Sequence, residues 1–354
     1  MTALKERLMA SAGSLVDDAF LLPPRIAGPF KPRRRIDRAA YERQLDFYFD
    51  QGYVDNPAAF FDFPAATPAW SIIARKPYHD GEYQLIRYES GYRTKNPLVR
   101  DKYQAFAANQ NGYLVRWTHG DANRKTILCH HGYMLGEPRQ ARRMFKVRHL
   151  FSRGLDVALF IAPFHWKRGA GSLLKRGIYL QPDDAVMTCE CVGQNMYDLY
   201  GAFQILSELG AADVGLIGAS LGGYNTALFI CLTDRAAFGA MMVPAVNFRR
   251  PLGPDSARHR FPVDERLRQK IQRVWELHSP MNFKPRIPGE KILVVASKND
   301  RICPFDYVQA LCDQWRLTNT YFLNGGHWLI FNRPERGRAW YGFLADRGFF
   351  RDTI

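Results

Sequence analysis

Three residues far apart in the chain have the side chains needed to turn an alcohol into a nucleophile. Ser220 is the centre of Gly218-Ala219-Ser220-Leu221-Gly222, Asp300 ends the segment 297–300, and His327 follows two glycines. A serine hydroxyl attacks poorly until a histidine accepts its proton, and a carboxylate keeps that histidine correctly oriented. These residue types predict acyl transfer, with Ser220 as nucleophile, His327 as base and Asp300 as the orienting acid.

Each of these assignments has an alternative that involves no catalysis. A Gly-x-Ser-x-Gly segment can be a plain glycine-rich turn, and His327 can be a loop histidine bonded to backbone. Asp300 can simply cap the helix expected to begin near Pro304, in which case Asp183 or Asp255 could supply the acid. All three residues follow candidate strands, however, and this joint placement favours the catalytic interpretation.

The residues around Ser220 predict a strand, a very tight turn and a helix. Residues 214–217 are small or apolar, and a helical run follows at 225–232. A serine in so sharp a turn must adopt a strained backbone conformation, which Gly218 and Gly222 permit because they carry no Cβ. This strand–turn–helix context is the one that a nucleophile elbow requires.

Acyl transfer also needs N–H donors for the negative charge that develops on the substrate oxygen. The backbone N–H of Leu221, the residue after the nucleophile, is the first candidate. The second should come from the loop after the strand at 126–129, where Gly132 allows a sharp turn. The N–H groups of Tyr133 and Met134 are therefore the expected partners of Leu221.

Metal and cofactor sites are not expected. His130 and His131 are adjacent on a strand and face opposite ways, so they cannot easily share an ion. The spacing of Cys189 and Cys191 does not fit a zinc pair, and the six cysteines are scattered. We expect a reduced, cytoplasmic protein without structural metal.

Apolar runs alternate with helical patterns along the body of the chain. Continuous runs predict strands buried on both faces at 126–129, 157–162, 214–217, 239–243, 292–296 and, more weakly, 320–323. Helical patterns occupy 137–153, 184–209, 223–236, 304–315 and 334–347. With an antiparallel lead-in pair at 83–88 and 113–117, these elements predict an α/β fold with a mostly parallel, eight-stranded sheet and helices on both faces.

The chain divides into an N-terminal extension (1–81) and a catalytic domain (82–354). The extension contains an expected amphipathic helix at 3–20, a second helix at 37–51 and an aromatic loop. The basic cluster at 31–35 beside helix 3–20 could bind a membrane surface, but packing of the helix on the body with solvated arginines is the preferred interpretation. Residues 247–282 interrupt the alternation and are expected to form a small lid over the carboxyl ends of the strands.

The composition and charge of the chain bear on where the protein acts and what it contacts more than on which reaction it catalyses. The 354 residues are 47% hydrophobic and carry a formal net charge of +15, with 49 Lys and Arg against 34 Asp and Glu. The charge allows peripheral contact with an anionic membrane surface, whereas specific nucleic-acid binding is not expected. Neither a membrane-spanning run nor a secretory signal is expected.

The combined motifs resemble the α/β-hydrolase superfamily. The resemblance covers about residues 82–350 and rests on His131-Gly132, the elbow at 218–222, the Asp300 loop and Gly326-His327. It implies a serine esterase or lipase-like enzyme whose triad runs in the order Ser, Asp, His. The Gly-Tyr-Met sequence after His131 departs from the three glycines of the hormone-sensitive-lipase branch.

The expected substrate is a hydrophobic or lipid-like acyl ester. His131, Phe164, Trp166 and Trp328 are the residues expected to bind it, because they lie near the same end of the sheet. An acyltransferase or a thioesterase would use the same triad with another acceptor or acyl carrier. A non-catalytic, basic binding protein is a third hypothesis, which the presence of all three triad residue types disfavours.

Overall fold

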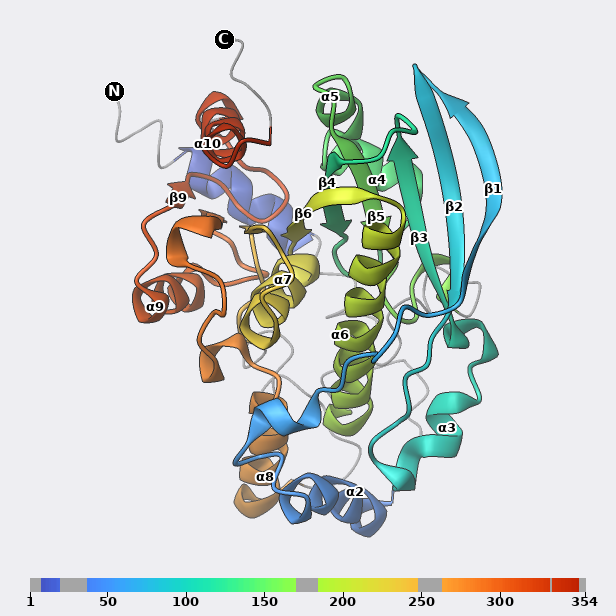
Figure 1. Cartoon of the computed structure of the whole chain (residues 1–354). Helices are drawn as coiled ribbons and strands as arrows, with labels where there is room; N and C mark the ends of the chain where they lie inside the picture. Colours follow the sequence, from blue (N-terminus) through green and yellow to red (C-terminus); the bar gives the residue numbers. More distant parts are fainter. Residues whose placement is uncertain (1–7, 20–36, 170–183, 248–262, 332, 350–354) are drawn as a thin grey trace.

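A computed structural model describes residues 8–19, 37–169, 184–247, 263–331 and 333–349. Its centre is a nine-stranded sheet in the order β1-β2-β3-β5-β4-β6-β7-β8-β9 (Figure 1). The strands are β1 (Trp70–Tyr78), β2 (Gly81–Glu89), β3 (Asn111–Thr118), β4 (Arg124–His130), β5 (Asp156–Phe160), β6 (Ala211–Ala219), β7 (Gly239–Met242), β8 (Ile292–Ser297) and β9 (Thr320–Leu323). From β5 to β9 all neighbours are parallel, whereas β1, β2 and β3 are antiparallel to their neighbours.

The α/β class with a mostly parallel sheet is confirmed, but the expected count of eight strands is wrong by one. The additional strand, β1, lies within the segment assigned to the extension and pairs with β2, with Pro77 opposite Glu82. An edge strand bonds along one side only, so it tolerates a proline that cannot donate. Its mixed polar pattern also lacks the continuous apolar run that marks the central strands.

Helices cover both faces of the sheet and form two cores. They are α2 (Arg38–Asp50), α3 (Arg100–Gln104), α4 (Pro138–Met144), α5 (Val147–Phe151), α6 (Ala185–Glu208), α7 (Leu221–Leu232), α8 (Glu265–Glu276), α9 (Phe305–Trp315) and α10 (Arg333–Asp346). Alternate residues of each buried strand supply the two cores: Leu216 of β6 packs with α6, α7 and α9, and Ile217 packs on the side of α4, α5 and α10. None of the helices in the described ranges is long and apolar enough to cross a membrane.

The helix expected at 137–153 is two short helices instead. Lys146 adopts a left-handed conformation, with φ 50°, between α4 and α5. A residue in this conformation cannot continue a right-handed helix, so the chain turns there. The apolar periodicity continues across the break, and Ala141 and Leu150 reach the same core.

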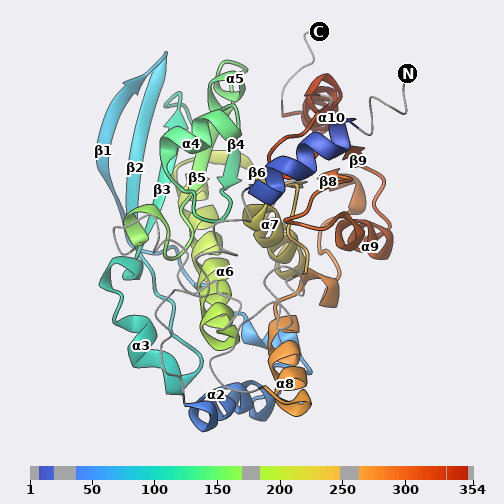
Figure 2. The same ribbon diagram turned by 180° about the vertical axis from the view of Figure 1, so that it is seen from behind.

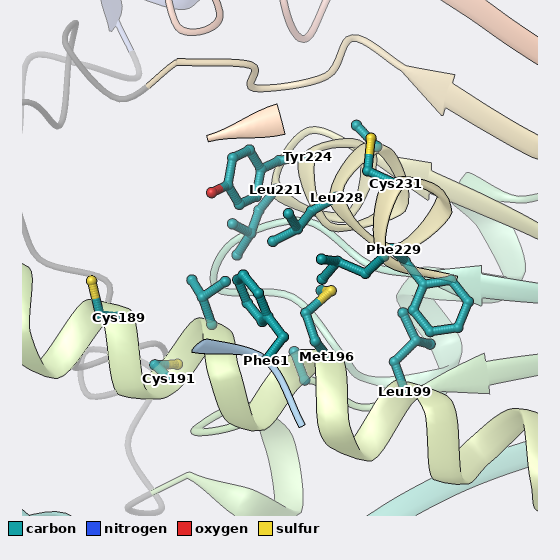
Figure 3. Close-up of a cluster of buried hydrophobic side chains, with 14 of the residues drawn as sticks. Phe61, Cys189, Cys191, Met196, Leu199, Leu221, Tyr224, Leu228, Phe229 and Cys231 are labelled. Atoms are coloured by element: carbon teal, nitrogen blue, oxygen red, sulfur yellow. The ribbon is translucent and has the colours of Figure 1, made fainter. Parts of the chain in front are cut away.

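The segment before β1 packs against the helices under the nucleophile loop. Figure 3 shows Phe61 between α6 and α7, close to Met196, Leu221 and Leu228. Phe61 is 8% exposed, and every residue of α7 is buried. Removing this much apolar surface from water stabilises the position of α7 and therefore of the serine at its start.

The part of the expected lid that the structure describes, α8, packs against α2 and α6; residues 248–262 lie outside the described ranges. Salt bridges join Arg38 to Asp264 and Arg273 to Asp55, and Cys189 of α6 bonds the carbonyl of Val274. Figure 1 shows α2 and α8 side by side at the end of the molecule that lies away from β1 and α10.

Candidate active site

Ser220 occupies the sharp turn between β6 and α7. Its backbone angles are φ 57° and ψ −116°, a region that residues with a Cβ rarely adopt. Its N–H donates to the carbonyl of Met242 at 2.9 Å, and its carbonyl accepts from Tyr224 at 3.0 Å and Ala245 at 3.2 Å. The neighbouring strand and the first turn of α7 therefore hold the strained conformation in place.

The two glycines of the elbow are required because there is no room for a side chain. A Cβ on Gly218 would lie 2.0 Å from the carbonyl oxygen of Gly222, and a Cβ on Gly222 would lie 2.0 Å from that of His130. These contacts are with backbone, which cannot move aside as a flexible side chain can. The motif thus reflects close packing of α7 against β4 and β6.

The structure brings the three predicted residues into one hydrogen-bonded chain. His327 Nε2 lies 3.0 Å from Ser220 Oγ, and His327 Nδ1 lies 2.7 Å from Asp300 Oδ2. The imidazole and carboxylate are almost fully buried, at 7% and 6% exposure. A histidine that donates from Nδ1 to a carboxylate presents Nε2 as an acceptor for the serine proton.

Asp300 also holds its own loop. Its second oxygen, Oδ1, accepts from the N–H groups of Ile302 at 2.9 Å and Cys303 at 2.7 Å. Helix α9 begins after Pro304 without a side-chain cap, so the helix-capping alternative is wrong. Oδ1 instead holds the turn before the helix, and Oδ2 bonds His327. The rival acids Asp183 and Asp255 lie outside the described residues.

The surroundings of His327 favour its protonated form. Burial lowers the pKa of His327, whereas a thiolate at Cys303 and the hydrogen bond to Asp300 raise it, and the net direction is upward from 6.5. Burial also raises the pKa of the Cys303 thiol itself. Since that thiol is protonated near neutral pH, Asp300 is the group that stabilises the imidazolium there.

Cys303 makes this cluster the place in the described residues where a metal could bind. One ligand atom each from Asp300, Cys303 and His327 lies within 4.8 Å of the others, and all three residues are buried. Nitrogen, oxygen and sulfur are suitable ligands for zinc. Asp300 and His327 already bond each other, however, so an ion would have to replace the contact that orients the histidine.

The backbone N–H groups expected to stabilise the oxyanion differ in their surroundings. Leu221 begins α7, so its N–H belongs to the first turn, where helical N–H groups have no partner within the helix. Gly132 lies beside the nucleophile, since a Cβ there would be 3.5 Å from that of Ser220. The N–H of Met134 donates to His165 Nε2 at 3.3 Å, so this candidate is already engaged by a side chain.

Comparison with known proteins supports the fold rather than a particular reaction. No family model matches the chain. The uncharacterized protein MT2702 of Mycobacterium tuberculosis (strain CDC 1551 / Oshkosh) is 25% identical over 335 residues, and Rv2627c of strain ATCC 25618 / H37Rv is 24% identical over 335 residues. Each alignment covers 92% of this chain and 80% of the relative.

Two solved esterases have a similar structure. The acetyl xylan esterase from Paenibacillus sp. R4 has a TM-score of 0.60 at 14% identity, covering 86% of this chain and 98% of that one. Acetyl xylan esterase 1 from Thermoanaerobacterium sp. JW/SL YS485 has a TM-score of 0.58 at 15% identity, covering 87% and 98%. The chain has the α/β-hydrolase fold.

Two of the residues expected to bind substrate are interior residues of this α/β-hydrolase fold. His131 is fully buried, its Nδ1 lies 2.8 Å from the carbonyl of Gly132, and its Nε2 accepts from the N–H of Ala162 at 3.1 Å. Phe164 is 1% exposed and packs edge-on against Tyr103. Both residues hold the loops after β4 and β5, because their polar or aromatic groups are already engaged there.

The two tryptophans differ in their relation to the site. Trp166 is half-buried and packs against Tyr113 and Lys167, on the β3 side of the fold. Trp328 is 47% exposed, and its ring lies edge-on to that of His327 at 5.5 Å between centroids. Of the four residues expected to bind substrate, Trp328 is the one that is both exposed and in contact with the His327 ring.

Asp17 was not expected at the site. It lies on the N-terminal helix, which the structure describes over residues 8–19. Its side chain is fully buried and accepts hydrogen bonds from the backbone N–H of His327. The expected apolar stripe of that helix is not its contact face, since Leu8 and Leu15 are 63% and 69% exposed. The sequence signal that could have indicated this contact is Gly13, which is one helical turn from Asp17 and leaves room for a close approach.

Proposed function

We propose that the protein is a serine carboxylic-ester hydrolase that works through an acyl-enzyme. The observation that carries this proposal is the chain of contacts from Ser220 Oγ to His327 Nε2, and from His327 Nδ1 to Asp300 Oδ2, at 3.0 and 2.7 Å. A structural serine would not need a strained turn at the start of a buried helix together with a buried imidazole–carboxylate pair.

In the proposed first half-reaction, Ser220 Oγ attacks the ester carbonyl while His327 Nε2 accepts the hydroxyl proton. Asp300 stabilises the resulting imidazolium, and the N–H groups of Leu221 and Tyr133 stabilise the oxyanion. The intermediate then collapses, the bond to the alcohol breaks, and His327 returns its proton to the leaving oxygen. The acyl group remains on Ser220.

In the second half-reaction, water replaces the alcohol. His327 accepts a proton from the water, whose oxygen attacks the acyl carbonyl, and the same donors stabilise the second intermediate. Collapse releases the acid and restores the hydroxyl of Ser220. An acyltransferase would differ only here, because an acceptor alcohol would take the place of water.

We propose a hydrophobic or lipid-like acyl ester as the substrate. Trp328, 47% exposed beside His327, supports an apolar acyl or alcohol group near the nucleophile. The names of the two acetyl xylan esterases point to a short acyl group in those proteins, which makes acyl length the quantity to measure. A series of p-nitrophenyl esters from acetyl to dodecanoyl would measure it.

Labelling with a fluorophosphonate tests the reaction class. The expected result is a single adduct on Ser220, mapped by peptide mass spectrometry, that is absent in Ser220→Ala and strongly reduced in His327→Ala. Folded wild-type protein that forms no adduct and hydrolyses no ester of the series would contradict the proposal. Adding alcohols during turnover separates the alternatives, since an acyltransferase makes new ester faster than free acid.

A further inference from the structure

The N-terminal helix contacts the body of the protein through a glycine and an acid. In the described part of this helix, residues 8–19, Gly13 and Asp17 are buried, while Leu8, Leu15 and Val16 are exposed. Figure 2 shows the helix (blue) lying beside α10. The helix therefore docks through the face that carries Asp17 and not through its leucines.

The Asp17 carboxylate bonds the backbone of both loops that carry the buried pair. Its two oxygens accept from the N–H of His327 at 2.9 and 2.8 Å, and Oδ1 also accepts from Trp328 at 3.3 Å. Oδ2 accepts from the N–H of Arg301, the residue after Asp300, at 3.1 Å. A single side chain thus ties together the two segments whose side chains meet at 2.7 Å.

Close packing of glycines allows this approach. A Cβ on Gly13 would lie 2.1 Å from the nitrogen of Gly326, and a Cβ on Gly326 would lie 2.6 Å from Asp17 Oδ2. The helix backbone therefore rests directly on the loop before His327. Asp18 contributes differently, since its half-buried carboxylate pairs with the exposed Arg301 guanidinium at 3.1 Å.

We propose that Asp17 is a positioning residue that holds the loops of Asp300 and His327 in register, so that the N-terminal helix completes the active site. This inference rests on the proposed hydrolase function. Asp17 reaches only backbone groups, so it acts through His327 and not on the substrate. Loss of this anchor frees the imidazole from its alignment with Ser220, and a displacement of about 1 Å can cost about a hundredfold in rate.

The test compares Asp17→Ala and Asp17→Asn with Asp18→Asn as the matched control. Asparagine keeps one acceptor oxygen but points an NH2 group at backbone donors, so both Asp17 variants should lose about a hundredfold in kcat with little change in KM. The rate of fluorophosphonate labelling at Ser220 should fall in parallel. Asp18→Asn should stay within about twofold of wild type, because the guanidinium that it pairs with is exposed.

Two further readouts separate positioning from a merely structural role. Rates are normalised to the titrated amount of labelled Ser220, and the pH midpoint of kcat/KM is measured for each variant. If Asp17 positions the loops, the pH midpoint of kcat/KM should be lower in the Asp17 variants, because His327 loses its close contact with Asp300. If the variants merely contain less folded protein, neither this midpoint nor the normalised rate should change.

The outcomes are distinguishable. Folded Asp17→Ala protein with wild-type kcat and midpoint would overturn the inference while leaving the proposed function intact. Failure of the wild type itself to label at Ser220 would overturn both. If Asp17→Ala does not fold, the same normalised rate and pH midpoint are measured for Asp17→Asn and Gly13→Ala. Gly13→Ala displaces the same helix without removing the acid.

Discussion

Ser220 Oγ and His327 Nε2 lie 3.0 Å apart although 107 residues separate them in the chain. The serine belongs to the turn after β6, whereas the histidine belongs to the loop after β9, three strands away in the sheet. Their contact needs the parallel order of β6 to β9, because parallel strands end at the same edge.

Two replacements of Ser220 should have the same effect on activity but different effects on stability. Both Ser220→Ala and Ser220→Gly should lose at least about 10³-fold in kcat. Glycine adopts φ 57° without strain, so Ser220→Gly should be more stable to urea than Ser220→Ala by about 1 kcal/mol. Equal unfolding free energies for the two variants would indicate that the elbow stores no strain.

The pH dependence should report the raised pKa of His327. The imidazole must be neutral to accept the serine proton, so kcat/KM should rise with pH through a midpoint above 6.5. In Asp300→Asn the hydrogen bond that favours the imidazolium is lost, so the midpoint should fall and kcat should drop by about 10⁴-fold. A wild-type midpoint below 6.5 would contradict the assigned cause.

Adding a methyl group to two glycines should have opposite effects. Gly222→Ala places a Cβ 2.0 Å from the His130 carbonyl oxygen and should destabilise the fold by about 3 kcal/mol or more. Gly342→Ala, in helix α10, meets nothing within 4 Å and should stabilise by about 0.5–1 kcal/mol. Thermal or urea unfolding gives the change in unfolding free energy for both variants. If Gly222→Ala were as stable as the wild type, α7 could not pack as closely on β4 as described.

The cysteines should be unreactive in the native protein. All six are free and buried, and burial raises the thiol pKa of each, to about 12 for Cys191 and Cys312. A chromogenic disulfide reagent should therefore detect no rapidly reacting thiol in native protein and six in urea. Rapid reaction of Cys303 in the native state would show that solvent reaches the thiol beside His327.

Local features of the chain were enough to predict the buried central strands, the elbow and the residue types of the site. Continuous apolar runs mark strands that are buried on both faces, and a serine between two glycines marks the turn, because sterics over a few residues decide both. Asp300 and His327 could be paired with Ser220 because each follows a strand of the same parallel set. These inferences depend on patterns that are contiguous in the chain.

Other features depend on which surfaces meet in three dimensions. The edge strand β1 exists because β2 offers it a partner, and His131 is engaged by backbone because the segment after β5 brings the N–H of Ala162 to its Nε2. Asp17 reaches His327 across 310 residues, against the apolar periodicity of its own helix. Local patterns in the chain thus set the conformation of each segment and the chemical groups of the site. Which distant backbone donors the buried Asp17 carboxylate satisfies depends instead on packing between segments that share no local pattern, so it emerges only when the chain is folded.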